Sequence, residues 1–218
     1  MADLGLYVDL SRCIGCYACV VGCKNWHQIG TGERGRIVLC DRMFGEFPEV
    51  TRWLFPIMCM QCENPPCISV CRHEATYKRE DGIIVIDSDK CVGCELCVAA
   101  CPYGLRSMKN SSDIVDACDF CSERIDSGLE PYCVTTCPTE ALVFGDLDDS
   151  RSQINTLIKN NETCRFDPYG TMPKVYYGKM REERNKGGSF SLSRLLAQSM
   201  TTCLSAGDET EKKKTPPG

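Results

Sequence analysis

The sequence has no long hydrophobic run, and it contains only two histidines and two tryptophans in 218 residues. Its longest uninterrupted aliphatic stretch is IIVI at 83–86. A membrane-spanning helix needs roughly 18 apolar residues or more. We therefore expect no transmembrane segment in this chain, and any link to a membrane would come through a partner.

Other absences exclude further classes of protein. The opening MADLGLYVDL has neither the basic nor the apolar region of a secretory signal, so we expect no export signal of its own. The net charge is −5 and charges of both signs are interspersed, which leaves no basic surface for nucleic acid. No hydrolytic triad, phosphate-binding loop or dinucleotide fingerprint is visible. We expect a chain that is not itself an enzyme.

Cysteine is what the sequence has in excess, with 19 residues, far above ordinary usage. Sixteen of them form four groups, each of which opens with C-x2-C and closes with C-x3-C. An odd count at such short spacings fits a disulfide framework poorly. Zinc ribbons use two separated C-x2-C pairs, so iron–sulfur clusters are favoured over zinc. Group one is Cys13, Cys16, Cys19 and Cys23; group two is Cys59, Cys62, Cys67 and Cys71; group three is Cys91, Cys94, Cys97 and Cys101; group four is Cys118, Cys121, Cys133 and Cys137.

The spacing within a group suits a cubane [4Fe-4S] cluster, whose four irons each need one thiolate. Three cysteines in a tight loop can bind three corners of one cube. In bacterial two-cluster ferredoxins of this spacing, the fourth cysteine binds the other cluster. We expect the fourth cysteine to start a helix, helped by the proline that follows it in groups three and four. Lys24 and Arg72 stand there instead in groups one and two, and whether they stabilise a reduced cluster or only meet solvent stays open.

The segment between groups two and three contains Asp81-Gly82, a dipeptide that favours a hairpin turn. Loop, hairpin, loop and helix is the plan of a two-cluster ferredoxin, so groups two and three are expected to exchange their fourth ligands. Groups one and four then exchange theirs, partly by elimination. The expected ligand sets are Cys13, Cys16, Cys19 and Cys137 for cluster 1; Cys59, Cys62, Cys67 and Cys101 for cluster 2; Cys71, Cys91, Cys94 and Cys97 for cluster 3; and Cys23, Cys118, Cys121 and Cys133 for cluster 4.

The same pattern predicts an α+β fold made of two interleaved two-cluster bacterial-ferredoxin-like modules, with insertions and a C-terminal extension. The outer module comprises residues 1–52 plus 113–150, and the central module comprises 53–112. Residues 151–218 form the extension, which we expect to dock a partner and to have a disordered end. Alternating residues in RIVL and VTRWLF, within 29–56, predict strands. SFSLSRLLAQSM at 189–200 predicts a short amphipathic helix.

A few residues remain outside the four groups. Cys40, Cys164 and Cys203 have no partner at ligand spacing, so we expect free thiols. Trp26 and His27 follow Cys23 directly. We expect them to be a packed aromatic residue and a core or partner-facing histidine, without a direct redox role.

Several stretches closely resemble the four-cluster iron–sulfur (beta) subunits of the dimethyl sulfoxide reductase superfamily of molybdenum/tungsten oxidoreductases. They are CMQCENPPCISVC, YKREDGIIVID, CVGCELCVAACPYG and the C-x2-C-x11-C-x3-CP of group four. The resemblance covers about residues 4–147, with a weaker echo in MPKVYYGKM at 172–180. It implies an electron-transfer subunit with four [4Fe-4S] clusters. These would relay electrons between a large catalytic subunit, which carries molybdenum or tungsten on a bis-pyranopterin, and an external partner such as a membrane anchor subunit or a soluble carrier.

Two other assemblies would use the same clusters: a hydrogenase or formate dehydrogenase complex, and a free-standing polyferredoxin. The long 29–56 insertion and the 150–218 extension favour a subunit over a free carrier. Without a signal of its own, the chain is expected in the cytoplasm, or exported already folded with a partner that carries a twin-arginine signal. The substrate of the partner is not encoded in this sequence.

Overall fold

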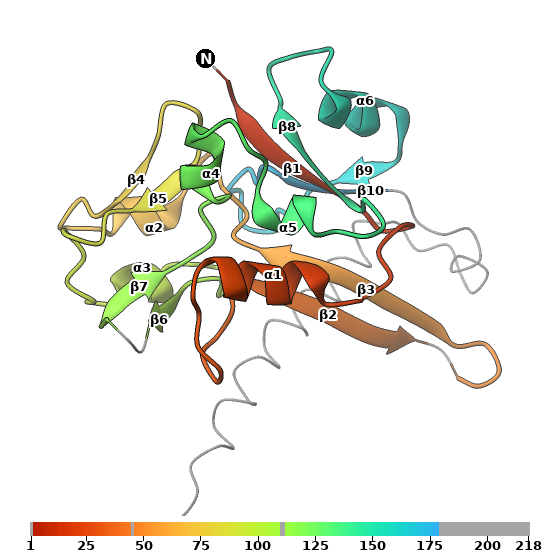
Figure 1. The fold of residues 1–218 in the computed structure, drawn as a ribbon, viewed down its shortest axis with the longest axis horizontal. Helices are drawn as coiled ribbons and strands as arrows, with labels where there is room; N and C mark the ends of the chain where they lie inside the picture. The colour runs from red at the N-terminus through yellow and green to blue at the C-terminus, as the bar shows by residue number, and fades with distance from the viewer. Residues whose placement is uncertain (1, 45, 110–111, 179–218) are drawn as a thin grey trace, which may run out of the picture.

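The computed structural model describes residues 2–44, 46–109 and 112–178, and it has a mixed α+β fold of short elements (Figure 1). In these residues no helix is long and apolar enough to cross a membrane. The elements in chain order are β1 (Leu4–Asp9), α1 (Ala18–Trp26), β2 (Ile37–Phe44), β3 (Thr51–Met58), α2 (Pro66–Ser69), β4 (Thr76–Lys78), β5 (Ile84–Ile86), α3 (Leu96–Ala99), β6 (Ser107–Lys109), β7 (Ile114–Asp116), α4 (Ser122–Asp126), α5 (Tyr132–Thr135), β8 (Leu142–Asp146), α6 (Gln153–Asn160), β9 (Thr163–Cys164) and β10 (Val175–Gly178).

A four-stranded sheet brings the start of the chain together with residues after 140. Its strand order is β8-β1-β10-β9, with β1 antiparallel to β8 and parallel to β10. Helix α6 packs on β8 and β1 and buries Ile154. Part of the C-terminal extension therefore completes a sheet begun by the first strand. The predicted helix at 189–200, the predicted disordered end and Cys203 lie outside the described residues.

Three antiparallel hairpins connect or extend the cysteine groups: β2–β3, β4–β5 and β6–β7. The strands predicted within 29–56 are confirmed as β2 and β3. The hairpin predicted at Asp81-Gly82 is confirmed as β4–β5, where Gly82 has a φ of 81°. Such a left-handed conformation costs glycine little because it has no Cβ atom.

The four cysteine groups share one backbone conformation. In every group the residue immediately before the second cysteine has a positive φ, which turns the chain sharply between the first two thiols. The third cysteine then lies on a helix: α1, α2, α3 or α5. The residues with positive φ are Gly15 (69°), Gln61 (47°), Gly93 (65°) and Phe120 (52°).

The fourth cysteine does not start a helix in any of the four groups, so that prediction is wrong. Helices α2, α3 and α5 end before it, and the chain then turns directly into β4, β6 or β8. In group one, α1 continues through Cys23 to Trp26. The turns are closed by backbone N–H groups that donate to the carbonyl of the fourth cysteine: Glu74 to Cys71 (3.2 Å), Gly104 to Cys101 (3.0 Å) and Glu140 to Cys137 (3.2 Å).

Strand β10 holds the β2–β3 hairpin against the rest of the core. The Tyr177 hydroxyl donates to the carbonyl of Pro56 at 3.2 Å, and its ring meets Phe55 edge-on at 5.8 Å. One main hydrophobic core contains Tyr177 and Phe55 together with buried cysteines of groups one, two and four. The hairpin is therefore fixed over the cysteine loops rather than projecting freely along its whole length.

Gly93 and Gly104 provide a matched test of this loop geometry. Both have positive φ, but a Cβ atom on Gly93 would lie 2.2 Å from the backbone oxygen of Asp113, whereas one on Gly104 would meet nothing within 4 Å. Gly104→Ala should cost only the ~1–2 kcal/mol of a left-handed alanine. Gly93→Ala should lower the thermal unfolding temperature further and release iron. Equal unfolding temperatures and iron contents in the two variants would contradict this.

Candidate iron–sulfur sites

The first three cysteines of group one meet Cys137 from the far end of group four. A cavity is lined by Cys13, Cys16, Cys19 and Cys137, and Leu39 and Pro56 of the β2–β3 hairpin line it too. Burial, followed by repulsion from Cys13 and Cys137, raises the pKa of Cys19 to about 12. The backbone N–H of Ala141 donates to the sulfur of Cys137 at 3.2 Å.

Cys23 leaves group one and lies among the other thiols of group four. Burial raises its pKa to about 12, opposed by the charge of Arg36 and reinforced by Cys121. Burial also raises the pKa values of Cys118 and Cys133 well above the ordinary value, and both are repelled by Cys23. The structure thus brings Cys23 together with three cysteines of group four.

Cys101 of group three lies with three cysteines of group two. Burial raises the pKa of Cys59 to about 12 and that of Cys62 to about 11. Repulsion from Cys67 and Cys101 adds to both shifts. The pKa of Cys67 is likewise raised by burial, with Cys101 contributing.

The remaining expected set comprises Cys71 and the first three cysteines of group three. Helices α2 and α3 pack against each other, and Cys91 packs on the small core cluster that contains Cys97. Burial opposes ionisation of Cys71, but hydrogen bonds from the backbone of Thr76 and Ala75 outweigh it and lower its pKa. Cys94 is exposed.

The donor chemistry of these sets suits [4Fe-4S] clusters, which are held by four cysteine thiolates. All sixteen predicted ligands lie in the described residues, and none is in a disulfide. Across those residues, no three or more His, Cys, Asp or Glu side chains are placed to hold a single metal ion. Thiols with raised pKa values must lose their protons when they bind iron, so cluster binding and deprotonation are coupled at these sites.

The prediction of free thiols for the cysteines outside the four groups is confirmed for one of the described residues and wrong for another. Cys164 is a free thiol, as predicted. Cys40 is disulfide-bonded and fully buried in β2, so the free-thiol prediction is wrong for it. Spacing in the sequence gives no information about such a bond, because it depends on how the hairpin packs.

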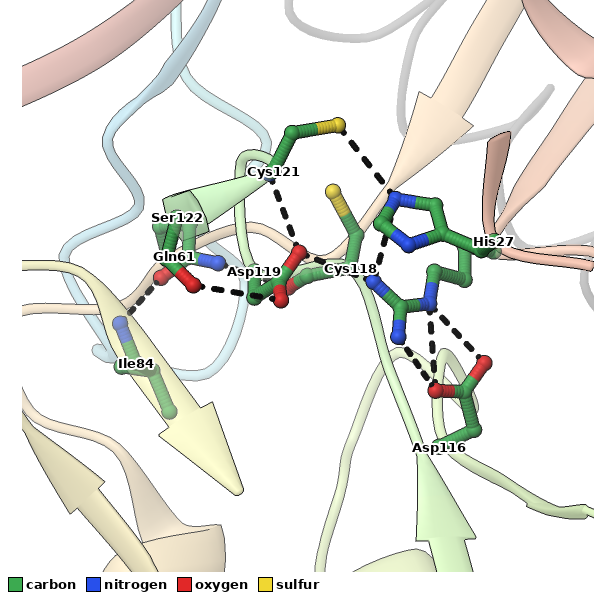
Figure 2. A network of polar contacts seen from close by, with 9 residues as sticks. His27, Gln61, Ile84, Asp116, Cys118, Asp119, Cys121 and Ser122 are labelled. Atoms are coloured by element: carbon green, nitrogen blue, oxygen red, sulfur yellow. Dashed lines mark hydrogen bonds and ion pairs between the residues drawn. The ribbon is translucent and has the colours of Figure 1, made fainter. Parts of the chain in front are cut away.

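A partly buried ion-pair network lies beside group four (Figure 2). Arg36 donates to Asp116 through Nε (2.9 and 3.1 Å to the two carboxylate oxygens) and Nη2 (2.7 Å), and to Asp119 through Nη1 (2.8 Å). Asp119 also accepts the backbone N–H of Cys121 at 3.0 Å. The guanidinium therefore fixes the loop that carries Cys118 and Cys121.

His27 extends this network to Cys121, one of the predicted cluster ligands. Its Nε2 atom lies 3.3 Å from the sulfur of Cys121 and 3.2 Å from Nη1 of Arg36. Burial and the charge of Arg36 lower the pKa of His27. A neutral imidazole has one N–H, so Nε2 either donates to Cys121 or accepts from Arg36. The neighbouring Trp26 is stacked on Tyr132 at 5.3 Å, as expected of a packed aromatic residue.

Sequence reasoning missed the residues that connect one cysteine loop to another. Gln61 is fully buried; its amide donates to the carbonyl of Cys118 at 2.7 Å, and its oxygen accepts the N–H of Ile84 at 2.7 Å (Figure 2). Asp116 and Asp119 flank Cys118 in the sequence, which is a weak local signal. Gln61 lies within the cysteine loop of group two, which is its one signal in the sequence. Arg36 has no signal of this kind.

Comparisons with known proteins agree with this geometry. Residues 50–147 match the 4Fe-4S dicluster domain, and residues 10–26 match a 4Fe-4S binding domain. The chain is 40% identical to the tetrathionate reductase B subunit of Salmonella typhimurium, covering 79% of this chain and 70% of the relative. It is 40% identical to the polysulfide reductase B component of Wolinella succinogenes (79% and 92%), and 37% identical to the selenate reductase B subunit of Mesobacillus selenatarsenatis (79% and 70%).

These identities and coverages decide the family. The chain is a member of the iron–sulfur B subunits of the dimethyl sulfoxide reductase type. Like other members of this family, it is an electron-transfer subunit that binds 4Fe-4S clusters through its cysteine motifs, and it is not the catalytic subunit. The resemblance found in the cysteine spacing is confirmed.

The partly buried network around Arg36 makes a prediction about stability. Arg36→Met leaves Asp116 and Asp119 without their cation, and their side chains are 16% and 24% exposed. The cost should therefore lie between the ~0–1 kcal/mol of an exposed pair and the ~3–5 kcal/mol of a fully buried one. The control is Arg52→Met, because the Arg52–Asp41 pair is much more exposed and such pairs contribute little. Thermal unfolding of the iron-loaded protein should show a much larger loss for Arg36→Met. Equal losses would show that the network does not hold the group-four loop.

Proposed function

We propose that this chain carries four [4Fe-4S] clusters, each held by three cysteines of one group and the fourth cysteine of another. The approach of Cys137 to the first three cysteines of group one is the observation that carries this proposal. The proposed sets are Cys13, Cys16, Cys19 and Cys137; Cys59, Cys62, Cys67 and Cys101; Cys71, Cys91, Cys94 and Cys97; and Cys23, Cys118, Cys121 and Cys133.

The proposed fold follows from this exchange. The outer module consists of residues 1–52 and 113–150 and holds the first and fourth clusters. The central module, 53–112, holds the second and third. The pairing of β1 with β8 supports the outer module, because it joins its two separate segments. The extension after 150 contributes β10 to that sheet.

The neighbours of individual thiols support an order for the relay. Cys133 of the fourth set is repelled by Cys19 of the first set. Cys118 of the fourth set is repelled by Cys59 of the second. Cys67 of the second set is repelled by Cys97 of the third. Electrons would thus pass between the sets in the order first, fourth, second, third, or in reverse.

The exposure of the cysteines also supports the first and third clusters as the two ends of the relay. Cys16 and Cys94, the second cysteines of groups one and three, are exposed, whereas Cys62 and Cys121 at the same place in groups two and four are buried. Apolar side chains lie exposed beside each accessible cysteine: Ile14 near Cys16, and Val92 near Cys94. A partner could therefore approach the first and third clusters closely but not the other two.

The clusters supply one-electron transfer, and the chain's own residues position and tune them. Buried thiols exclude water from the second and fourth sites. Backbone N–H groups at Cys71 and Cys137 donate to ligand sulfur, and such hydrogen bonds raise cluster potentials. With every iron bound by a thiolate, no site is left for a substrate, which agrees with a subunit that only relays electrons.

The proposed partner at the first-cluster end is a large catalytic subunit with molybdenum or tungsten on a bis-pyranopterin. The names of the relatives support this, since they are B subunits of reductases of tetrathionate, selenate and polysulfide. At the third-cluster end we propose an external redox partner, either a membrane anchor subunit or a soluble carrier. The location of the chain, in the cytoplasm or exported folded, then follows that of its catalytic partner.

Metal analysis of the native complex, purified without oxygen, tests this function. We expect about sixteen irons and one molybdenum or tungsten per copy of this chain. Sixteen irons with neither metal would overturn the proposed partner and indicate a hydrogenase assembly or a free polyferredoxin. Four irons fewer would overturn the count of four clusters.

A further inference from the structure

Arg106 is a buried cation that lies between two of the proposed cluster sites. It stands between the turn at Gly104 and strand β6, and only 3% of it is exposed. Its Nη1 donates to the hydroxyl oxygen of Thr76 at 3.1 Å. Among the described residues it forms no ion pair with a carboxylate, and its buried Nη2 has no hydrogen-bond partner.

The charges that face Arg106 are cysteine sulfurs from two different sets. Cys67 and Cys59 belong to the proposed second cluster, and Cys97 belongs to the proposed third. An arginine stays protonated in proteins. Burying it without an anion is costly, and protonated thiols would not offset that cost. Anionic cluster sulfur on both sides would offset it. A side-chain hydrogen bond already joins Arg106 to Cys97, and the unpaired Nη2 is a further donor for cluster sulfur.

Arg36 provides the contrast. It is a second, partly buried arginine near the proposed cluster ligands, but Asp116 and Asp119 neutralise it. No carboxylate among the described residues neutralises Arg106, so its positive charge acts on the sulfur atoms around it. The two cations therefore act differently: Arg36 fixes a loop, and Arg106 adds positive charge to the site itself.

We propose that Arg106 is a shared counter-charge for the second and third clusters, anchored by Thr76, and that it raises the reduction potentials of both. The inference rests on the proposed function, because it takes the cluster assignments from there. Each reduction adds one electron and one negative charge to a cluster. No proton moves, since Arg106 remains charged in both states, and its attraction to the added charge favours the reduced form.

The test is a redox titration of the anaerobic native complex with dithionite, followed by electron paramagnetic resonance. Cys59→Ser and Cys94→Ser identify the signals of the second and third clusters. In Arg106→Gln, the equilibrium constant for reduction should fall at least tenfold at both clusters, which is about 59 mV for one electron. The first and fourth clusters should titrate as in the unmodified protein. Arg106→Lys keeps the charge and should shift both potentials less.

The control variant is Arg151→Gln, which removes the same charge from an exposed side chain paired with Asp149 and should leave all four potentials unchanged. Unchanged potentials in Arg106→Gln with sixteen irons present would overturn the inference, as would a shift at one cluster only. If Arg106→Gln loses iron, the iron content of Arg106→Lys decides: the retained charge should keep sixteen irons, and the same loss of iron in Arg106→Lys would overturn the inference. Fewer than sixteen irons in the unmodified protein would instead count against the proposed function.

Discussion

The close approach of cysteine thiols from distant parts of the chain is the constraint on which the rest of the structure depends. Cys19 and Cys137 are neighbours although more than half of the chain separates them, and Cys23 lies with Cys118 although nearly half of the chain separates those two. Buried thiols repel one another as soon as they ionise. Burial keeps their pKa values high until iron takes up the negative charge, so folding and cluster binding are coupled.

The short helices, turns and hairpins of the fold bring these distant cysteines together. A left-handed residue before each second cysteine turns the chain tightly, and a single helical turn in groups two, three and four then directs the fourth cysteine away from its own group. The hairpins and the four-stranded sheet hold these loops in place. Gln61 shows how close the loops come, since one buried amide joins the group-two loop to Cys118 and to β5.

The sequence alone predicted the parts that are local. Cysteine spacing predicted the four groups and the family, Asp81-Gly82 predicted a hairpin, and alternating residues predicted β2 and β3. Apart from the expected exchange of fourth cysteines, interactions between distant segments were out of reach, because no pattern in the sequence records them. The parallel pairing of β10 with β1, the Arg36 network, the unpaired Nη2 of Arg106 and the bonded Cys40 all belong to this class.

The central claim is that the fourth cysteines are exchanged between groups, and a pair of variants tests it most directly. Cys137→Ser and Cys133→Ser each remove one thiol near the end of group four. Mössbauer and electron paramagnetic resonance spectra of the reduced protein would show which cluster is altered. The account predicts that Cys137→Ser alters the first-group cluster and Cys133→Ser alters the fourth-group cluster. Loss of the same cluster in both variants would contradict it.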